Sequence, residues 1–227
     1  MINFHEIDNL KFMEKVPDKF YSWAIVDPEW GIDITNQSMG SNSKNSLANN
    51  KKYNKKNWDK KPPPKKYFDE LFRISENQII WGVDYFDLPN IGNGRIKWNK
   101  LKPKGISFNN FEIAYCSAIE TEIEFKYLWN GMQQGISLMN PEKQQGNHKL
   151  KEKKIHPTHK PINLYLWIMI NFLKKGDNII DTNGGGMSIA IAADKLGYDL
   201  DVCENDPEYF KLGTAAYSNY KQQLTLF

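Results

Sequence analysis

The sequence predicts an α/β fold with a mostly parallel sheet, and three observations support that prediction. The last third of the chain reads KKGDNIIDTNGGG, MSIAIAADKLG and YDLDVCEND in succession, which is the strand, helix and strand order of a parallel βαβ unit. The apolar run Ser22–Val26 indicates another buried strand near the start. The chain has 227 residues, a length that suits one domain with one sizeable core.

Composition is typical of a globular protein in a reducing compartment. Hydrophobic residues make up 40% of the chain and charged residues 25%, with a net charge of only +3. No signal peptide is recognisable, and the longest apolar run, INLYLWIMINFL, is shorter than the roughly 20 residues that span a bilayer. Cys116 and Cys203 show neither metal spacing nor a disulfide framework. We therefore expect a cytoplasmic protein with no membrane partner and no metal.

The remaining elements follow in order along the chain. Apolar residues at helical spacing in YFDELFRIS predict a helix, and NQIIWGVDYF predicts a buried strand followed by a turn. Further strands are predicted in GRIKWNK, NFEIAYCS and IEFKYLWN. The polar stretch GMQQGISLMNPEKQQGNHKLKEKK breaks this pattern. Pro161–Lys174 is predicted to be a helix with proline in its first turn.

One segment, residues 35–66, is too long and too polar for a simple connection. From Lys44 onward Asp59 is its only acid, and two aromatic residues stand among its lysines. Two interpretations stay open. The segment is either a solvated loop or a flap that contacts nucleic-acid phosphates. In the second case the contacting residues are expected to include Lys51, Lys52, Lys55 and Lys56.

The glycine cluster indicates a nucleotide-like ligand. Glycines between a strand and a helix let the backbone approach a ligand closely, and the helix N-terminus adds N–H donors. The next strand ends at Glu204, about 20 residues farther on, where a carboxylate binds ribose hydroxyls in Rossmann-type units. NAD and S-adenosylmethionine both fit this series. The C-terminal position of the unit and the unspaced glycines of TNGGGM argue against a dehydrogenase.

Longer stretches resemble the amino-group DNA methyltransferases. IHPTHKP and GDNIIDTNGGGMSIAIAADKLGYDLDVCENDPEY are similar to their cofactor-binding half, and DPEW is similar to their catalytic D-P-P-[YFW] motif. The catalytic motif comes first, as in the beta class, and NQIIWGVDYF, IKWNK and NFEIAYCS resemble small phage or prophage members. The resemblance covers Ser22 to Tyr209. It implies a Rossmann-like S-adenosylmethionine-dependent methyltransferase fold, with helices on both sheet faces and a circularly permuted motif order.

The resemblance also implies how DPEW would act. The Asp27 carboxylate and the Pro28 carbonyl would accept hydrogen bonds from an exocyclic amine, and Trp30 would stack on a flipped base. Adenine N6 is the preferred target, since cytosine-directed members more often begin this motif with serine. Two departures leave full activity open: Glu29 replaces the second proline, and Met187 stands where a further glycine is usual.

For the cofactor, S-adenosylmethionine, the resemblance implies a second group of residues. Asp181 and the backbone around the glycines would hold the methionine part, and Glu204 would bind the ribose. A flanking motif precedes them in the chain. The residues expected to form the cofactor site are Asp181, Gly184, Gly185, Glu204, Thr158, Lys160 and Pro161.

Residues 1–227 are predicted to form a single methyltransferase domain with three appended segments. They are the Lys-rich loop 35–66, a short target-recognition insert at 130–154, and a tail at 221–227. Lysines of the insert, among them Lys153, are expected to contact DNA phosphates. Gln223–Phe227 resembles the peptide that docks bacterial replication proteins on the sliding clamp, and it could equally pack on its own domain.

Three functions stay open at this point. The first is methyl transfer from S-adenosylmethionine to an exocyclic amine of DNA. The second is a DNA-binding relative that has lost catalysis, motivated by Glu29 and Met187. The third is an amino methyltransferase acting on RNA or protein, although the lysine-rich segment favours a polyanion. The oligomeric state is not predicted.

Overall fold

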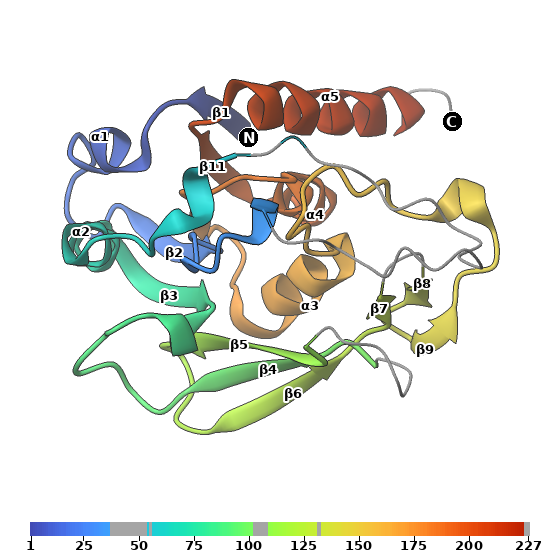
Figure 1. The fold of residues 1–227 in the computed structure, drawn as a ribbon, viewed down its shortest axis with the longest axis horizontal. Helices are drawn as coiled ribbons and strands as arrows, with labels where there is room; N and C mark the ends of the chain where they lie inside the picture. Colours follow the sequence, from blue (N-terminus) through green and yellow to red (C-terminus); the bar gives the residue numbers. More distant parts are fainter. Residues whose placement is uncertain (37–53, 55, 102–108, 131–132, 225–227) are drawn as a thin grey trace.

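A computed structural model describes residues 1–36, 54, 56–101, 109–130 and 133–224. It contains an eight-stranded sheet with helices on both faces and a three-stranded sheet beside it (Figure 1). Among these described strands, only β5 runs against its neighbours in the large sheet; the other pairs are parallel. In spatial order the strands are β1 (Ile2–Glu6), β11 (Asp199–Glu204), β10 (Asn178–Asp181), β2 (Tyr21–Val26), β3 (Ser75–Trp81), β5 (Phe111–Cys116), β4 (Arg95–Asn99) and β6 (Glu122–Lys126).

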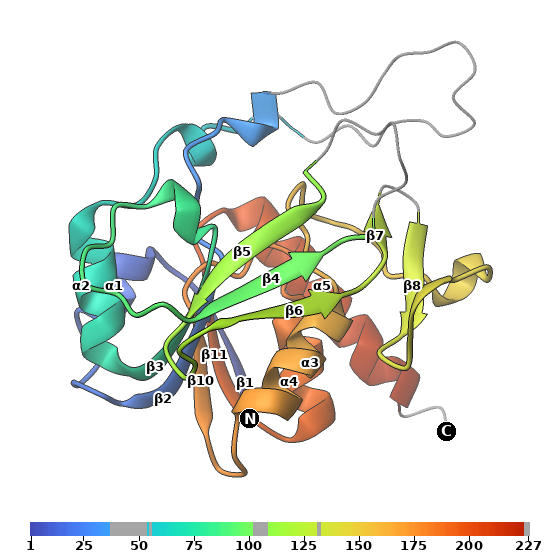
Figure 2. The same ribbon diagram turned by 90° about the horizontal axis from the view of Figure 1, so that it is seen from below.

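Two groups of helices cover the two faces of the sheet. One face carries the short α1 and the longer α2, while α3, α4 and α5 pack on the other (Figures 1 and 2). Their bounds are α1 (Asn9–Met13), α2 (Lys65–Ile74), α3 (Ile162–Phe172), α4 (Ser188–Leu196) and α5 (Pro207–Leu224). Within the described residues, no helix is long and apolar enough to cross a membrane.

Strand β2 is apolar at every position except Ser22, and its packing explains why. Successive side chains of a strand point to opposite faces. Trp23 and Ile25 join the core under α3 and α4, whereas Ala24 and Val26 join the core under α1 and α2. A strand covered on both faces reads as a continuous apolar run, so the sequence pattern is explained by the two-sided packing.

The sheet has a topological switch point between β10 and β2. Ile180 lies opposite Ala24 in this parallel pair. The chain leaves β10 through α4 toward β11, and leaves β2 through α2 toward β3, so the two connections diverge. Ligands of open α/β sheets bind in the crevice that such a divergence creates at the carboxyl ends of the strands.

The predicted α/β class is confirmed, and most predicted elements lie where the sequence placed them. The polar stretch after Asn130 shows no strand pattern in the sequence, yet it contains two strands. It forms strands β8 (Gln133–Ser137) and β9 (Asn140–Gln144); β8 pairs with β7 (Trp129–Asn130) on one side and with β9 on the other. Exposed edge strands can be largely polar, so the composition of β9 carried no strand signal.

Three other outcomes concern the chain ends and the Lys-rich loop. Strand β1 and helix α5 were not predicted. Residues 221–224 of the predicted tail continue α5, while residues 225–227 lie outside the described part. Most of the loop, with Lys51, Lys52 and Lys55, also lies outside it.

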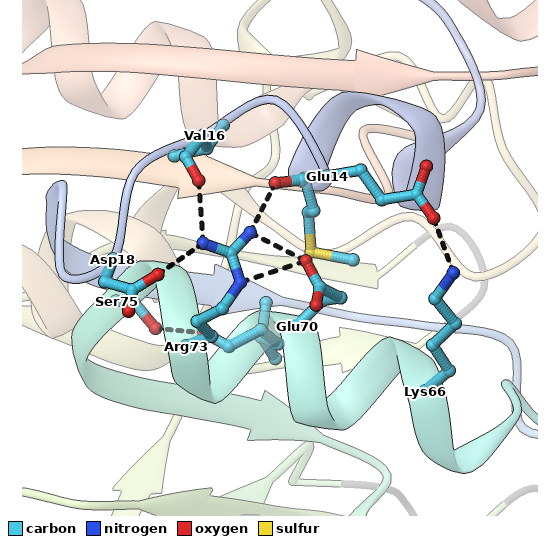
Figure 3. Close-up of polar contacts among 9 residues, drawn as sticks. Glu14, Val16, Asp18, Lys66, Glu70, Arg73 and Ser75 are labelled. Carbon is cyan, nitrogen blue, oxygen red and sulfur yellow. Dashed lines mark hydrogen bonds and ion pairs between the residues drawn. The ribbon is translucent and has the colours of Figure 1, made fainter.

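Arg73 ties α2 to the segment that follows α1 (Figure 3). Its Nη1 donates to the Val16 carbonyl at 2.8 Å and pairs with Asp18 at 2.7 Å. Its Nη2 donates to the Met13 carbonyl at 2.8 Å and pairs with Glu70 at 2.7 Å. We call these five residues the Arg73 junction. It joins two helices on the face that α1 and α2 cover.

Candidate active site

A cleft of about 1540 Å³ opens at the carboxyl ends of the central strands. It brings together segments that lie far apart in the sequence: the turn after β2, the glycine loop after β10, the end of β11 and the segment before α3. The predicted residues that line it are Asp27, Pro28, Trp30, Thr158, Lys160, Gly184, Gly185, Glu204 and Lys153. Asp181 and Pro161 do not line it; Asp181 is buried, and Pro161 precedes the first residue of α3.

A buried lysine stands at the centre of the cleft. The Nζ of Lys160 lies 2.5 Å from Asp27 Oδ2 and 3.2 Å from Glu112 Oε2. The indole rings of Trp30 and Trp81 lie 5.3 Å and 5.4 Å from the same Nζ, within range of cation–π attraction. We call Lys160, Asp27 and Glu112 the Lys160 centre. The sequence placed Lys160 in the cofactor site, and the structure pairs it with the predicted catalytic acid.

The two acids of the Lys160 centre differ in charge environment. Burial raises the pKa of Asp27, although Lys160 acts in the opposite direction. Burial would also raise the pKa of Glu112, but Lys100 and Lys160 outweigh it and hold that pKa at about 2. Side-chain hydrogen bonds from Lys160 and Trp30 lower the Asp27 pKa, and the buried Oδ1 is the Asp27 oxygen that accepts no well-aligned hydrogen bond from the described residues.

Trp30 forms an aromatic wall at the cleft. Its ring stacks on that of Tyr85, with centroids 4.9 Å apart and planes inclined by 17°. The indole lies against Gly82, where an added Cβ would stand 2.2 Å from Trp30 Nε1. Gly82 has φ of +74°, so both its conformation and this close approach favour glycine. Glycine at position 82 thus leaves the space that the Trp30 ring occupies.

Glu29, the departure from the family motif, also faces the cleft. Burial raises its pKa to about 7, and the nearby Glu204, Asp59 and Asp27 add to the shift. Asn183 Nδ2 donates to its Oε2 at 3.4 Å. Its carboxyl group is therefore held beside the glycine loop and protonates near neutral pH.

Main-chain hydrogen bonds shape the glycine loop. The Gly185 N–H donates to Glu204 Oε2 at 2.7 Å, and the Gly184 N–H donates to the Cys203 carbonyl at 2.8 Å. Asp181 Oδ1 accepts from the Asn183 N–H at 3.0 Å, and burial raises the Asp181 pKa to about 7. Asp181 is buried and holds the loop through the Asn183 N–H, whereas Glu204 lines the cleft. Their proposed cofactor contacts stay predictions.

Met187, the second departure, borders the cleft, and its side chain belongs to the hydrophobic core. It is 1% exposed and adopts a left-handed φ of 51° at the N-terminus of α4. An added Cβ on Gly213 of α5 would lie 2.5 Å from Met187 Sδ. The methionine side chain thus occupies space that a glycine of α5 leaves open.

The segment before α3 contains the predicted turn. Thr158 Oγ1 lies 3.0 Å from His156 Nδ1, and burial lowers the pKa of His156 to about 3. His159 Nε2 lies 2.8 Å from Ser188 Oγ, which joins this turn to α4. Both histidines therefore have structural partners here, and the turn leads into α3 as expected.

Lys56 and Lys153, the two described lysines that are predicted to bind DNA, have different surroundings. Lys56 pairs with Asp206 and Glu208, each at 2.8 Å, and these acids raise its pKa. Its ammonium is thus engaged by the N-terminal turn of α5, so the phosphate contact predicted for it has a protein competitor. Lys153 is exposed and lines the cleft, and its contact with DNA stays a prediction.

Sequence reasoning gave no role in the site to Glu112, Asp59 or Tyr85, which also line the cleft, and it considered Trp58 only as part of a possible phosphate-contacting flap. Asp59 was noticed only as the single acid of a lysine run. Aromatic residues flanked by charge offered a signal for Trp58, whereas Glu112 lies on a strand whose place in the sheet the sequence did not reveal. Both cysteines are free and buried in the sheet, which confirms them as core residues.

Comparison with known proteins places this fold among methyltransferases. The PvuII DNA methyltransferase (cytosine-N4-specific) matches with a TM-score of 0.56 at 12% identity, covering 95% of this chain and 86% of that one. The M1.HpyAVI complex with SAM matches at 0.52 and 15%, covering 95% and 99%. TTHA0409 from Thermus thermophilus, a putative DNA modification methylase complexed with S-adenosyl-L-methionine, matches at 0.52 and 13%, covering 96% and 94%. These likenesses establish a methyltransferase fold.

Sequence comparison identifies the family. No curated protein matches this chain. The profile of the N6/N4 methyltransferase family, described as DNA methylase, matches residues 9–215, a range that contains every described strand except β1. The chain belongs to this family of amino-group DNA methylases.

Proposed function

We propose that the cleft transfers a methyl group from S-adenosylmethionine to an exocyclic amine of a DNA base, with adenine N6 as the preferred target. The observation that supports this most directly is the unpaired Oδ1 of Asp27, held beside Lys160 next to the glycine loop. A buried acceptor without a partner is costly in a folded protein. It is explained if an incoming amine donates to it.

Three acids of the cleft, together with the buried Asp181 beside the glycine loop, suit the proposed cofactor. Asp27, Glu29, Asp181 and Glu204 all have pKa values raised chiefly by burial. S-adenosylmethionine carries a sulfonium and an ammonium, and these charges would stabilise the ionised carboxylates. We expect the Gly184–Gly185 backbone to lie against the methionine part and Glu204 to bind the ribose. Two fold relatives are named as complexes with this molecule.

Thr158, Lys160 and Pro161 take different parts in this proposal. Thr158 lines the cleft and is proposed to flank the cofactor, and Pro161 begins the helix that supports it. Lys160 is proposed to act mainly on Asp27, because its Nζ pairs with that carboxylate.

The chain's own groups would prepare the amine. The bound cofactor supplies an electrophilic methyl group. Asp27 Oδ1 and the Pro28 carbonyl accept the two N–H bonds, which favours a tetrahedral nitrogen with an available lone pair. The nitrogen must lose a proton after transfer, and the ionised Asp27 is the nearest proposed acceptor. Lys160 keeps a positive charge beside Asp27 and so favours its ionised form.

The base and its strand would meet the outer cleft. Trp30 and Tyr85 offer flat faces to an extruded base, and Lys153 provides a cation for the backbone. We favour adenine because the motif begins with Asp27. We also propose the beta class, a circularly permuted order and a phage-type origin, on the motif order alone. The recognition insert 130–154 and the single domain 1–227 are part of this proposal.

Two measurements test the proposal. Calorimetry should detect S-adenosylmethionine binding to the purified protein, and loss of binding in Glu204→Gln would support the ribose contact. Methyl transfer from radiolabelled cofactor should then appear on unmethylated genomic DNA, and not on RNA or protein. Cofactor binding without transfer would instead favour the DNA-binding relative that has lost catalysis.

A further inference from the structure

We propose that Asp59 is a positioning residue that holds the catalytic turn in its active shape, an inference that rests on the proposed function. Asp59 lies in a short 3-10 turn, Trp58–Lys60, at the end of the Lys-rich loop. Its side chain is buried, with the residue 2% exposed. Sequence patterns assigned it no role, and it belongs to neither the catalytic motif nor the cofactor motif.

The carboxylate of Asp59 organises the backbone that follows the catalytic motif. Its Oδ1 accepts from the N–H groups of Trp30 and Gly31, and its Oδ2 accepts from that of Ile34, each at 2.9 Å. The Asp59 carbonyl accepts from the Asp33 N–H at 2.7 Å. One distant residue thus satisfies four N–H groups of a stretch that lies mostly outside regular structure.

A close approach between glycine and proline supports the same arrangement. A Cβ added to Gly31 would lie 2.5 Å from Pro62 Cδ, and Gly31 has φ of +75°. Pro62 follows Asp59 by three residues, so the segment that carries the carboxylate also packs directly on the turn. Only a residue without a side chain allows this contact at a left-handed φ.

The segment 56–62 also contacts the cofactor side of the cleft. The Trp58 ring stacks on His156 at 5.0 Å, and His156 packs edge-on against Tyr209 at 4.3 Å. Lys56 pairs with Asp206, whose N–H donates to Glu204 Oε1 at 2.7 Å. Residues 56–62 therefore connect the catalytic turn to the wall that carries the proposed ribose acid.

The position of the turn matters because two of its acceptors must face one nitrogen. Asp27 and Pro28 immediately precede the residues that Asp59 holds. Displacement of a reacting group by about 1 Å can lower a rate about 100-fold. Asp59 touches neither base nor cofactor in this account, so it acts through the turn.

Asp59→Asn tests the inference. Both carboxylate oxygens of Asp59 accept from backbone N–H groups, and the NH₂ of asparagine would replace one acceptor by a donor that faces another donor. Asp33→Asn is the matched control: Asp33 is an acid of the turn itself, and among the described residues its side chain accepts only an exposed hydrogen bond, from Asn36 Nδ2. Rates should be divided by the concentration of cofactor-binding sites, which is measured by titration with the cofactor. A variant that is partly unfolded is then not mistaken for a slow enzyme. Amide exchange of residues 30, 31 and 34 provides a second readout.

We expect Asp59→Asn to lower kcat by about 10- to 100-fold with little change in the cofactor Kd, and to speed exchange at residues 30, 31 and 34. Asp33→Asn should have the same kcat and the same amide exchange rates as the unchanged protein. A kcat of Asp59→Asn equal to that of the unchanged protein would overturn the inference, even if the amides of residues 30, 31 and 34 exchanged faster. Unchanged exchange at these amides would overturn it too.

If Asp59→Asn does not fold, Asp59→Ser, which keeps one oxygen acceptor, takes its place under the same criteria. Failure of the proposed function looks different. In that case the unchanged protein transfers no methyl group, while the exchange comparison still reports whether Asp59 holds the turn.

Discussion

The Arg73 junction and the Lys160 centre are both cations placed between two acids, yet they differ in how well they are satisfied. The Arg73 side chain is 29% exposed and meets two carbonyls as well as two carboxylates. The Lys160 side chain is 2% exposed, and Asp27 Oδ1, Glu112 Oε2 and Lys160 Nζ make no well-aligned hydrogen bond among the described residues. The charged groups of the Arg73 junction are satisfied by one another and by carbonyls, whereas the Lys160 centre keeps an acceptor that a ligand can use.

The difference indicates what each cluster contributes. A satisfied cluster at a helix junction stabilises the fold. Replacing a whole buried ion pair by apolar residues often costs little stability, although removing one partner alone is strongly destabilising, so such a pair is retained where chemistry needs it. Glu112 is held ionised by two lysines, whereas Asp27 shares one of them and keeps a raised pKa. Asp27 is thus the acid whose charge responds to what enters the cleft.

The largest expected effect is on catalysis. Asp27→Asn should lower methyl transfer by about 1000-fold or more, since it removes the charge that the amine faces. Cofactor affinity should change little. The matched control is Asp18→Asn in the Arg73 junction, which should leave the rate per folded molecule unchanged. Radiolabel transfer checks both, and equal losses in the two variants would contradict the comparison.

The next effect is on stability at the Lys160 centre. Lys160→Met leaves two buried carboxyl groups without their shared cation, at an expected loss of about 3–5 kcal/mol. The loss should be larger at pH 8 than at pH 5, because the acids can protonate at the lower pH. Urea unfolding at both values measures this. A loss independent of pH would indicate that packing, and not charge, is what Lys160 supplies.

A smaller stability loss is expected at the Arg73 junction. Arg73→Met should lower the free energy of unfolding by about 2 kcal/mol, a value reduced for partial exposure. The rate of methyl transfer per cofactor-binding site should stay unchanged, because the junction lies away from the cleft. Urea unfolding and the transfer assay together test this, and a lower rate per site would contradict it.

The smallest effect is the pH dependence of cofactor binding. The folded-state pKa values of Glu29 and Asp181, about 7, lie above the ordinary 4.5 and 3.8. Their contribution to stability is therefore complete below about pH 4 and is lost as pH rises through 7. A cationic cofactor favours the ionised acids, so its affinity should rise about tenfold from pH 6 to 8. Calorimetry tests this; affinity that falls over this interval would contradict it.

The fold and the motifs were readable from local patterns, and the connections between them were not. The βαβ unit and β2 follow from periodicity and glycine placement. The Lys160–Glu112 pair depends on β5 being inserted antiparallel between β3 and β4, which no local pattern shows. The hydrogen bonds of Asp59 depend on a long loop returning to the turn it left. Partners distant in sequence carry no periodic signal.

The central claim is that this cleft modifies an amino group of DNA through Asp27. Methylation-aware sequencing of DNA from cells that express either the unchanged protein or Asp27→Ala tests it most directly. We expect a methylated amino base, with adenine N6 preferred, at a defined sequence in the first sample and its absence in the second. A mark that survives in the Asp27→Ala sample, or the lack of any mark with the unchanged protein, would contradict the account.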